Sequence, residues 1–422
     1  MPRARHPSAP ESQTTIPRDA NRYPAPMPPL TLIQTVGQQT MPALTGVLGY
    51  QPTSAVHIFA SEDAAASRRV EVAATLAGVL QTRWVHVAVS NEDLLGNAEA
   101  AACHAIEKAR SAGSAVLLNL TGGTKLLAIG AYRAAMRLNV PCIYLELPQG
   151  DLDGLPQIVH FGETDPRITA PRDPAPTLNL EVLAAANGYT LVDAGDDPAR
   201  YRPLANALLA DFDAEEMTHL ALPRAIQGKV PFPNAPEWKR WLEPFVLPTH
   251  IADAAEAAGV VERAGDRWAL GSAERGAPDH VRRQTLERNA SLLNGAWVEI
   301  ALHAALSEHT ALRDVRWSVL AENPRPLEHD VLALKGTQLL LASCKRSTQP
   351  GIFGHLRELS THASRLGGLK AIKAICIARI DTNRRADGTG TVGSDLTEVC
   401  ESLGITLITG ADLRRRQLPD IA

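Results

Sequence analysis

Short apolar runs alternate with longer Ala-rich amphipathic segments between residues 30 and 147. Runs of this length, rich in β-branched residues, are typical of buried strands, and the Ala-rich segments have the apolar spacing of helices. Strand and helix in alternation predict βαβ units and a mainly parallel, doubly wound sheet. The predicted strands are Leu30–Val36, Ala55–Ser61, Trp84–Ser90, Ala115–Thr121 and Pro141–Leu147, and the predicted helices are 63–80, 92–111 and 124–138.

A second alternating pattern occupies the last third of the chain. A hydrophobic segment at 292–308 predicts a helix, and three apolar runs after it predict strands, the last two joined by a tight turn at Lys335-Gly336. Another helix, strand, helix and strand follow, with a polar loop at 381–394, so the pattern predicts an independent α/β domain. The predicted strands are Val315–Leu320, His329–Leu334, Gln338–Lys345, Ala371–Ile380 and Ile405–Thr409, and the later helices are 353–366 and 395–403.

The segments that flank these two patterns have few regularly spaced apolar positions. The first residues are rich in Pro, Arg and Ser and predict a disordered tail, and four prolines in Glu163–Thr177 predict a linker. Trp238–Ala258 predicts a helix and Val260–Leu270 a hairpin, which together indicate a winged-helix-like unit that binds DNA or serves as a packing or dimerisation spacer. The expected segments are a tail at 1–29, a first domain at 30–165, a middle region at 166–285 and a last domain at 286–422.

Composition narrows the class of protein further. A length of 422 residues favours two or three domains over one. Hydrophobic residues make up 45% of the chain without any apolar run long enough to cross a bilayer, so we expect a soluble protein with no membrane partner. Five cysteines without CxxC spacing argue against a disulfide framework and a zinc site, and favour a cytoplasmic location. A net charge of −4 gives no overall attraction to nucleic acid, so any such contact has to be local.

A glycine-rich turn follows the fourth predicted strand. Gly122-Gly123-Thr124-Lys125 leads directly into a helix, so backbone N–H groups and a helix N-terminus converge at the carboxyl end of a strand. This arrangement suits an anion, usually a phosphate. The segment is neither a Walker A loop nor a GxGxxG dinucleotide turn, because the lysine follows the threonine and the glycines are spaced differently. The alternative is a tight strand-to-helix connection capped by Thr124 or Thr121.

Acidic residues and a lysine gather in the last domain. Glu328 and Asp330 stand two apart on one predicted strand, and Ser343 and Lys345 stand two apart on the next. If these strands pair, the carboxylates meet the lysine beside Glu299 of the preceding helix. Carboxylates that hold Mg²⁺ or Mn²⁺, with a lysine that orients or deprotonates water, suit metal-assisted phosphodiester cleavage. The alternative is an ordinary hairpin with exposed charges.

Both motifs resemble those of one family. The segment Asn119–Lys125 is similar to the N-x-TGGTK signature of CARF domains, the sensors of cyclic oligoadenylate in type III CRISPR defence. The last third resembles the PD-(D/E)xK nuclease domain fused to CARF in nucleases activated by cyclic tetra-adenylate. There a helix carries G-x-W-x-E, a strand N-E-x-D-V and the next strand E-C-K, and the matching segments here are Gly295–Glu299, Leu327–Val331 and Ser343–Lys345. The resemblance covers most of the chain from about Thr31, the middle third only weakly.

The resemblance implies a fold and catalytic roles. The α/β fold would consist of a Rossmann-like CARF domain, a small winged-helix-like middle region and a restriction-endonuclease-like PD-(D/E)xK domain. Asp330 would be a metal ligand and Lys345 the water-activating residue, with Glu299 as a second acid and the Cys344 carbonyl as a further ligand of Mn²⁺ or Mg²⁺. The family's glutamate before this cysteine is Ser343 here, and a hydroxyl is a poorer Mg²⁺ ligand than a carboxylate. Either Glu328 or Glu299 supplies the missing carboxylate, or the site is weakened or inactive.

The resemblance also implies a homodimer and an activator. Two CARF domains would form one symmetric pocket for a symmetric ring of adenylates, with cyclic tetra-adenylate as the allosteric activator. The substrates would be single-stranded RNA or DNA, or supercoiled duplex DNA. Basic residues of the cleft would contact their phosphates, with Arg346, Arg357, Arg365 and Lys370 as candidates. The residues expected around the activator are Thr121, Gly122, Gly123, Thr124 and Lys125, with Gln38, Gln39, Thr40 and Ser61 as walls.

Two other functions fit the same residues. In the first, the chain is a ligand-responsive DNA-binding regulator whose last domain is degenerate, and Ser343 is its best support. In the second, the sensor domain is a ring nuclease that degrades its own cyclic oligoadenylate, with Thr121, Thr124 or Lys125 positioning the 2′-hydroxyl. Sequence-selective duplex binding without metal-dependent cleavage would indicate the first, and loss of ligand on incubation would indicate the second.

Overall fold

The structure is a computed structural model of the 422-residue chain. It describes residues 29–146, 157–162, 165, 167–168, 170–193, 195–211, 244–272, 277–348, 351–368, 370–380 and 392–419. The predicted tail up to residue 28, the start of the predicted helix at 238 and most of the predicted polar loop at 381–394 lie outside the described residues. In the part of the chain that is described, no helix is both long and apolar enough to cross a membrane.

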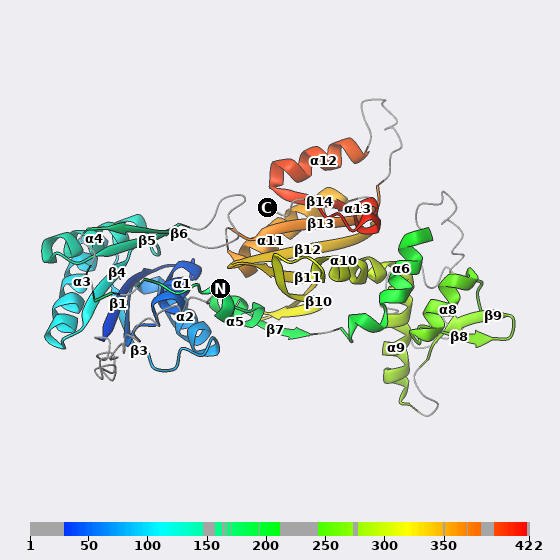
Figure 1. Ribbon diagram of the computed structural model, residues 1–422, viewed down its shortest axis with the longest axis horizontal. Coiled ribbons are helices and arrows are strands. Elements are labelled where there is room, and N and C mark those ends of the chain that lie inside the picture. The colour runs from blue at the N-terminus through cyan, green and yellow to red at the C-terminus, as the bar shows by residue number, and fades with distance from the viewer. Residues whose placement is uncertain are drawn as a thin grey trace, which may run out of the picture.

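The N-terminal domain is built on a six-stranded sheet in the order β3-β2-β1-β4-β5-β6. All neighbouring strands are parallel except β6, which runs antiparallel to β5 (Figure 1). The five predicted strands are confirmed, and β6 is an additional edge strand. The strands are β1 (Leu30–Val36), β2 (Ser54–Ala60), β3 (Arg83–Val89), β4 (Ala115–Asn119), β5 (Cys142–Glu146) and β6 (Gln157–Phe161).

Helices cover both faces of this sheet. Ile33 and Leu118 pack among α3 and α4, whereas Leu32 and Leu117 pack among α1 and α2 on the opposite face. This arrangement is the doubly wound, Rossmann-like fold that the strand–helix alternation predicts. The helices are α1 (Met41–Tyr50), α2 (Ala64–Leu76), α3 (Leu94–Ser111) and α4 (Lys125–Leu138).

The C-terminal domain contains a second, mixed six-stranded sheet in the order β14-β13-β12-β11-β10-β7. β10, β11 and β12 form an antiparallel meander, and β12, β13 and β14 are parallel. The edge strand β7 comes from Thr190–Asp193, in the range expected for the middle region. The other strands are β10 (Leu312–Glu322), β11 (Pro326–Lys335), β12 (Gln338–Ser347), β13 (Ile372–Arg379) and β14 (Ile405–Thr409).

The helices of this half differ from their predicted bounds in two places. The helix expected from residue 292 is already helical from Asp279, as α9 (Asp279–Ser291), a π-helical turn (Leu292–Ala296) and α10 (Trp297–Ser307). In the middle region, α8 (Thr249–Ala257) begins only after Pro248, because Phe245 is extended and pairs with Trp268. The hairpin that follows is confirmed as β8 (Val261–Ala264) and β9 (Arg267–Leu270). The remaining helices are α5 (Leu180–Ala186), α6 (Arg202–Asp211), α11 (Ile352–Gly367), α12 (Val392–Leu403) and α13 (Gly410–Arg415).

The two sheets share one hydrophobic core through α5. Leu180, Val182 and Leu183 of α5 belong to the same buried cluster as Leu44 of α1 and Leu356 of α11. The last domain is therefore not packed independently of the first. Figure 1 shows α5 between the two halves, directly before β7.

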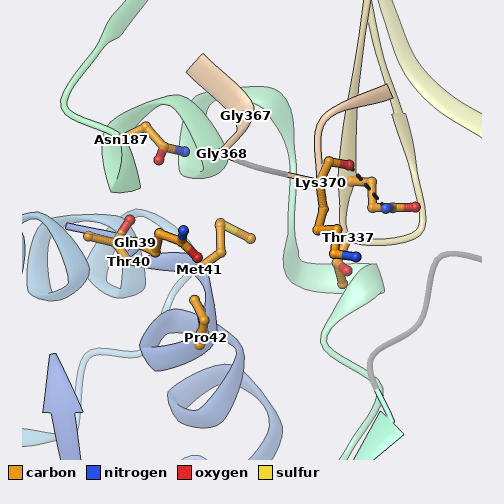
Figure 2. A pocket seen from close by; sticks show the side chains of 10 residues that line it. Gln39, Thr40, Met41, Pro42, Asn187, Thr337, Gly367, Gly368 and Lys370 are labelled. Carbon is orange, nitrogen blue, oxygen red and sulfur yellow. Dashed lines mark hydrogen bonds between the residues drawn. The ribbon is translucent and has the colours of Figure 1, made fainter. Parts of the chain in front are cut away.

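A hydrogen bond and a small pocket mark the same junction. The hydroxyl of Thr40, in the loop after β1, donates to the carbonyl of Ala186 at the end of α5, at 2.6 Å. Figure 2 shows the pocket beside it, where Gln39 and Thr40 face Thr337 of the β11–β12 turn and Lys370 beyond α11. The loop expected to bind the activator thus lies against both the C-terminal sheet and the helix that follows β12.

Candidate functional site

The acidic cluster forms where β11 and β12 separate. Their backbone pairing runs from Lys335 and Gln338 at the turn to Val331 and Ala342. One residue further, the Asp330 carboxylate occupies the fork, because its Oδ2 accepts hydrogen bonds from the Cys344 backbone N–H at 2.5 Å and from the Ser343 hydroxyl at 3.0 Å. The two strands pair as the sequence predicts, and their divergence leaves room for a side chain between them.

Lys345 completes this cluster. Its ammonium group donates to the Cys344 carbonyl at 2.9 Å and to the Ser343 hydroxyl at 3.1 Å, and it lies 3.7 Å from Asp330 Oδ2. Ser343 therefore stands between the lysine and the aspartate and contacts both. The lysine and aspartate side chains remain partly exposed, so a substrate can reach them.

Two more carboxylates lie near Asp330. Glu299, from the first turn of α10, is partly buried, and its pKa is raised well above the usual range by that burial first, and then by the negative charges of Asp330 and Glu328. The Glu328 carboxylate accepts a hydrogen bond from the Ser318 hydroxyl of β10 at 2.9 Å. Ser318 was not identified from the sequence. Its one unusual feature is a left-handed backbone (φ 49°) in the middle of a strand, which is visible only in the structure.

Helix α11 forms the other wall of the cleft. His355, Glu358 and His362 of this helix line a cleft of about 210 Å³ together with the β11 and β12 residues. The imidazoles of His362 and His329 lie 6.1 Å apart at the ring centres. Burial lowers the pKa of His329 to about 4, so this histidine is neutral at physiological pH. The α11 side chains carry no motif, and only the packing of the helix beside β12 places them in the cleft.

The donor atoms suit a hard divalent cation. Asp330, Glu299 and Glu328 offer carboxylate oxygens, and Cys344 offers its carbonyl. Mutual repulsion among the three carboxylates is the feature that a cation would relieve. Among the described residues, no three His, Cys, Asp or Glu side chains already surround a single point as ligands. The cluster therefore fits a hydrated Mg²⁺ or Mn²⁺ that retains several waters.

The glycine turn of the N-terminal domain connects β4 to α4. The Thr35 hydroxyl of β1 donates to the Gly122 carbonyl at 2.6 Å. A Cβ at Gly122 would lie 2.3 Å from the Thr35 carbonyl oxygen, and Gly123 has a left-handed backbone (φ 77°). Both positions require glycine, and the turn packs directly against the end of β1.

The helix behind this turn has a capped N-terminus. Thr124 is its N-cap, with a hydroxyl that accepts from the Leu127 N–H at 3.3 Å. The capping alternative is correct for Thr124, but it leaves Gly123, Thr124 and Lys125 exposed at the positive end of a helix. Capping and anion binding are thus compatible here.

The remaining ligand candidates have identifiable partners. The Thr121 hydroxyl donates to Asn119 Oδ1 at 2.7 Å and accepts from the Leu145 N–H at 2.7 Å. Gln38 donates to the Asp63 carboxylate, and the Ser61 hydroxyl donates to the Val89 carbonyl at 3.1 Å. The Thr121 bonds hold the first residue of the turn in place, whereas the other two join segments at the ends of β1, β2 and β3.

Gln39 and Thr40 lie apart from the turn. Gln39 is exposed and lines the junction pocket, whereas Thr40 is fully buried and bonded to α5 (Figure 2).

Comparisons with known proteins place the fold. No family model and no curated protein sequence matches this chain. The structure aligns with Can2 from Sulfobacillus thermosulfidooxidans, solved in complex with cyclic tetra-adenylate, with a TM-score of 0.64 at 16% identity over 92% of this chain and 98% of that one. The protein VC1899 from Vibrio cholerae aligns equally well, with a TM-score of 0.64 at 12% identity over 92% and 96% of the two chains.

These alignments cover the whole arrangement rather than one domain. A parallel Rossmann-like sheet followed by a mixed sheet, in one order along the chain, is common to this chain and Can2. The chain therefore has the fold of Can2 over nearly its entire length.

Proposed function

We propose that this chain is a cyclic tetra-adenylate-activated, metal-dependent endonuclease of type III CRISPR antiviral defence. The observation that carries the proposal is the fork between β11 and β12, where Asp330, Ser343 and Lys345 are joined by hydrogen bonds beside the partly buried acid Glu299. The fold of Can2, solved with cyclic tetra-adenylate, supports the choice of activator.

Each residue of the fork has a distinct task. Asp330, Glu299 and the Cys344 carbonyl would hold Mg²⁺ or Mn²⁺, with Glu328 as the additional carboxylate that Ser343 does not provide. When bound, such a cation neutralises the developing charge on a scissile phosphate. Lys345, whose ammonium is held 3.7 Å from Asp330, orients the attacking water and stabilises the negative charge.

The activator would bind at the glycine turn. Its phosphates would lie on the N–H groups of Gly122, Gly123 and Thr124, with the cation of Lys125 nearby. A ring with two-fold symmetry requires the same turn from a second copy of the chain.

An apolar stripe on α4 supports such a dimer. The side chains of Leu126, Ile129 and Met136 are about half exposed at 52%, 49% and 57%, and they recur at helical spacing directly behind the turn. Exposed apolar side chains grouped along one helix face are typical of an interaction surface. Pairing through α4 would bring two glycine turns close together.

A cleavage assay tests the proposal. Purified chain is incubated with labelled single-stranded RNA, single-stranded DNA or supercoiled plasmid, with Mn²⁺ or Mg²⁺, and with or without cyclic tetra-adenylate. We expect cleavage only with metal and activator, and a loss of about 10³-fold or more in Asp330→Asn, as expected for removal of a central metal ligand. Glu401→Gln, exposed on α12 and outside the lining of the cleft, is the matched carboxylate control and should cleave like the parent.

Two observations support the alternative function as a regulator. Ser343 replaces a carboxylate, and the helix–hairpin unit of α8, β8 and β9 is present in the middle region. If the activator binds but neither metal supports cleavage, and the chain instead binds duplex DNA selectively, the regulator function replaces the nuclease. Disappearance of the activator during incubation would indicate the ring nuclease.

A further inference from the structure

A row of buried polar side chains crosses the N-terminal sheet. Asn119 of β4, Gln34 of β1 and His57 of β2 are neighbours in the strand register, and His86 of β3 is the next. Asn119, Gln34 and His57 are essentially inaccessible to solvent. Polar groups in such a position require hydrogen-bond partners, and each has one within the row.

The row is continuous from the glycine turn to the surface. Asn119 Nδ2 lies 2.9 Å from Gln34 Oε1, Gln34 Nε2 lies 3.2 Å from His57 Nε2, and His57 Nδ1 lies 2.9 Å from the Ser67 hydroxyl of α2. The same hydroxyl lies 2.7 Å from His86 Nδ1, and His86 Nε2 lies 2.8 Å from the carboxylate of Glu71. One end is at the turn and the other is at the partly exposed Glu71.

Two backbone groups fix the orientation of the Asn119 amide beside the turn. The Thr121 N–H can only donate, and it donates to Asn119 Oδ1 at 3.1 Å. The Pro42 carbonyl can only accept, and it accepts from Asn119 Nδ2 at 3.1 Å. Both constraints orient the Asn119 amide the same way, so Gln34 must accept from Asn119 with its oxygen and donate to His57 with its nitrogen.

The other end is compatible with the same direction. Because His57 Nε2 accepts from Gln34, its proton is on Nδ1 and is donated to Ser67. Ser67 can then donate to His86 Nδ1, and His86 Nε2 donates to Glu71, whose carboxylate can only accept. A neutral His57 is consistent with its burial, which together with the neighbouring His86 lowers its pKa to about 3.

A glycine keeps the row intact where it meets α1. A Cβ at Gly46 would lie 2.7 Å from Gln34 Oε1 and 2.8 Å from Asn119 Nδ2, closer than such contacts allow. Helix α1 therefore packs over the amide pair without displacing it.

We propose that Ser67 and His57 are positioning residues for the glycine turn, because the fixed direction of this row keeps Asn119 Oδ1 toward the Thr121 N–H. Reversing the row would turn the Asn119 amide and place its NH₂ group against that N–H, which cannot accept. The turn would then lose the bond that holds its first residue. The ligand part of this inference rests on the proposed function, whereas the tautomer of His57 and the bond to Thr121 do not.

Ser67→Ala tests the row with a small change. It leaves the buried His57 Nδ1–H without an acceptor, which favours the other tautomer and a turned Gln34. Three measurements are compared: ¹⁵N shifts of histidine-labelled protein, hydrogen exchange of the Thr121 amide, and the calorimetric affinity for cyclic tetra-adenylate. Thr75→Val is the control, because it removes another α2 hydroxyl, one that bonds only the Glu71 backbone carbonyl.

In the parent we expect a proton on His57 Nδ1 and a protected Thr121 amide. In Ser67→Ala we expect a mixture of tautomers, with exchange of Thr121 about tenfold faster and binding about tenfold weaker, the effect of one hydrogen bond. Thr75→Val should match the parent in all three. A proton on Nε2 in the parent, or exchange and affinity in Ser67→Ala within about twofold of the parent, would overturn the inference.

Two further outcomes distinguish a failure of the row from a failure of the proposed function. If Ser67→Ala does not fold, Glu71→Ala removes the acceptor at the partly exposed end of the row and should also mix the His57 tautomers, and an unchanged tautomer there overturns the inference. If the parent does not bind cyclic tetra-adenylate, the proposed function fails, and the tautomer and the Thr121 exchange still decide the role of the row.

Discussion

At the scale of single residues, the acidic cluster holds three carboxylates close together, with Lys345 as the neighbouring cation. The repulsion acts most strongly on Glu299, because it is partly buried and lies near Asp330 and Glu328. The neutral acid is therefore the favoured form in the metal-free fold, and ionising it costs folding free energy.

This cost predicts a pH-dependent effect of Glu299→Gln. Because the folded-state pKa is raised above the usual 4.5, the stabilisation by the neutral acid is complete below pH 4.5 and is lost as the pH rises toward the raised value. Glutamine stays neutral, so the metal-free variant should melt about 2–4 °C above the parent at pH 8 and like the parent near pH 4.5. Differential scanning calorimetry at the two pH values measures this. An equal or lower melting temperature at pH 8 would contradict the role given to Glu299.

Ser343 gives a second prediction at this scale. Its hydroxyl lies between Asp330 and Lys345, so Ser343→Glu would bring a fourth carboxylate to the cation. Added ligand charge tightens binding of hard cations, and we expect half-saturation of cleavage at about tenfold lower Mn²⁺. Ser343→Ala is the control, because it removes the two hydrogen bonds without adding charge. An unchanged Mn²⁺ dependence in Ser343→Glu would place residue 343 outside the metal site.

At the scale of elements, the sequence predicts what periodicity and turn chemistry encode. All five parallel strands and the β8–β9 hairpin were predicted, because their apolar runs end at turn residues. Helix α1 was not, since all ten of its residues are buried and an all-apolar segment has no amphipathic period. The short edge strands β6 and β7 lack a two-sided pattern and form only because a neighbouring strand offers unpaired backbone groups.

The residues of the candidate site also differ in whether local sequence predicts them. The glycine turn, the two acids of β11 and Ser343 and Lys345 of β12 were found from local spacing, because one element or one hairpin holds them. The contributions of Ser318 and of α11 could not be found that way, since they come from other elements that tertiary packing brings to the fork.

The glycine turn makes a prediction about an element. Gly123→Ala would place a methyl group on a left-handed backbone and against Leu127, and so distort the phosphate-facing N–H groups. We expect affinity for cyclic tetra-adenylate to fall about tenfold or more, in line with the cost of such strain. Gly78→Ala, also left-handed but with no atom near its Cβ, is the control and should bind like the parent. Equal affinities of the two variants in calorimetry would remove the turn from the ligand site.

At the scale of the whole molecule, the two sheets are joined by a common core rather than a flexible tether. The loop after β1 is bonded to α5, and α5 packs with α11, which lines the cleft beside the acidic cluster. A shift of the loop on ligand binding would therefore be transmitted to the cleft through packed side chains.

The proposed dimer makes a further prediction at the scale of the whole molecule. Ile129→Glu would place a charge in the apolar stripe of α4 and should convert a dimer to a monomer with weakened binding of the symmetric ring. Leu76→Glu is the control, because Leu76 is also exposed, at 59%, but lies on α2. Sedimentation velocity of the two variants measures this, and a dimer that survives Ile129→Glu would exclude α4 as its interface.

The most direct test of the account is the initial rate of nucleic-acid cleavage as a function of cyclic tetra-adenylate concentration, with Mn²⁺ fixed. Control of the C-terminal cleft by the N-terminal turn predicts a saturable rise from a negligible rate, with saturation at one ring per two chains and a half-point that agrees with the calorimetric affinity. The same rate with and without the activator, or saturated binding that produces no cleavage, would contradict it.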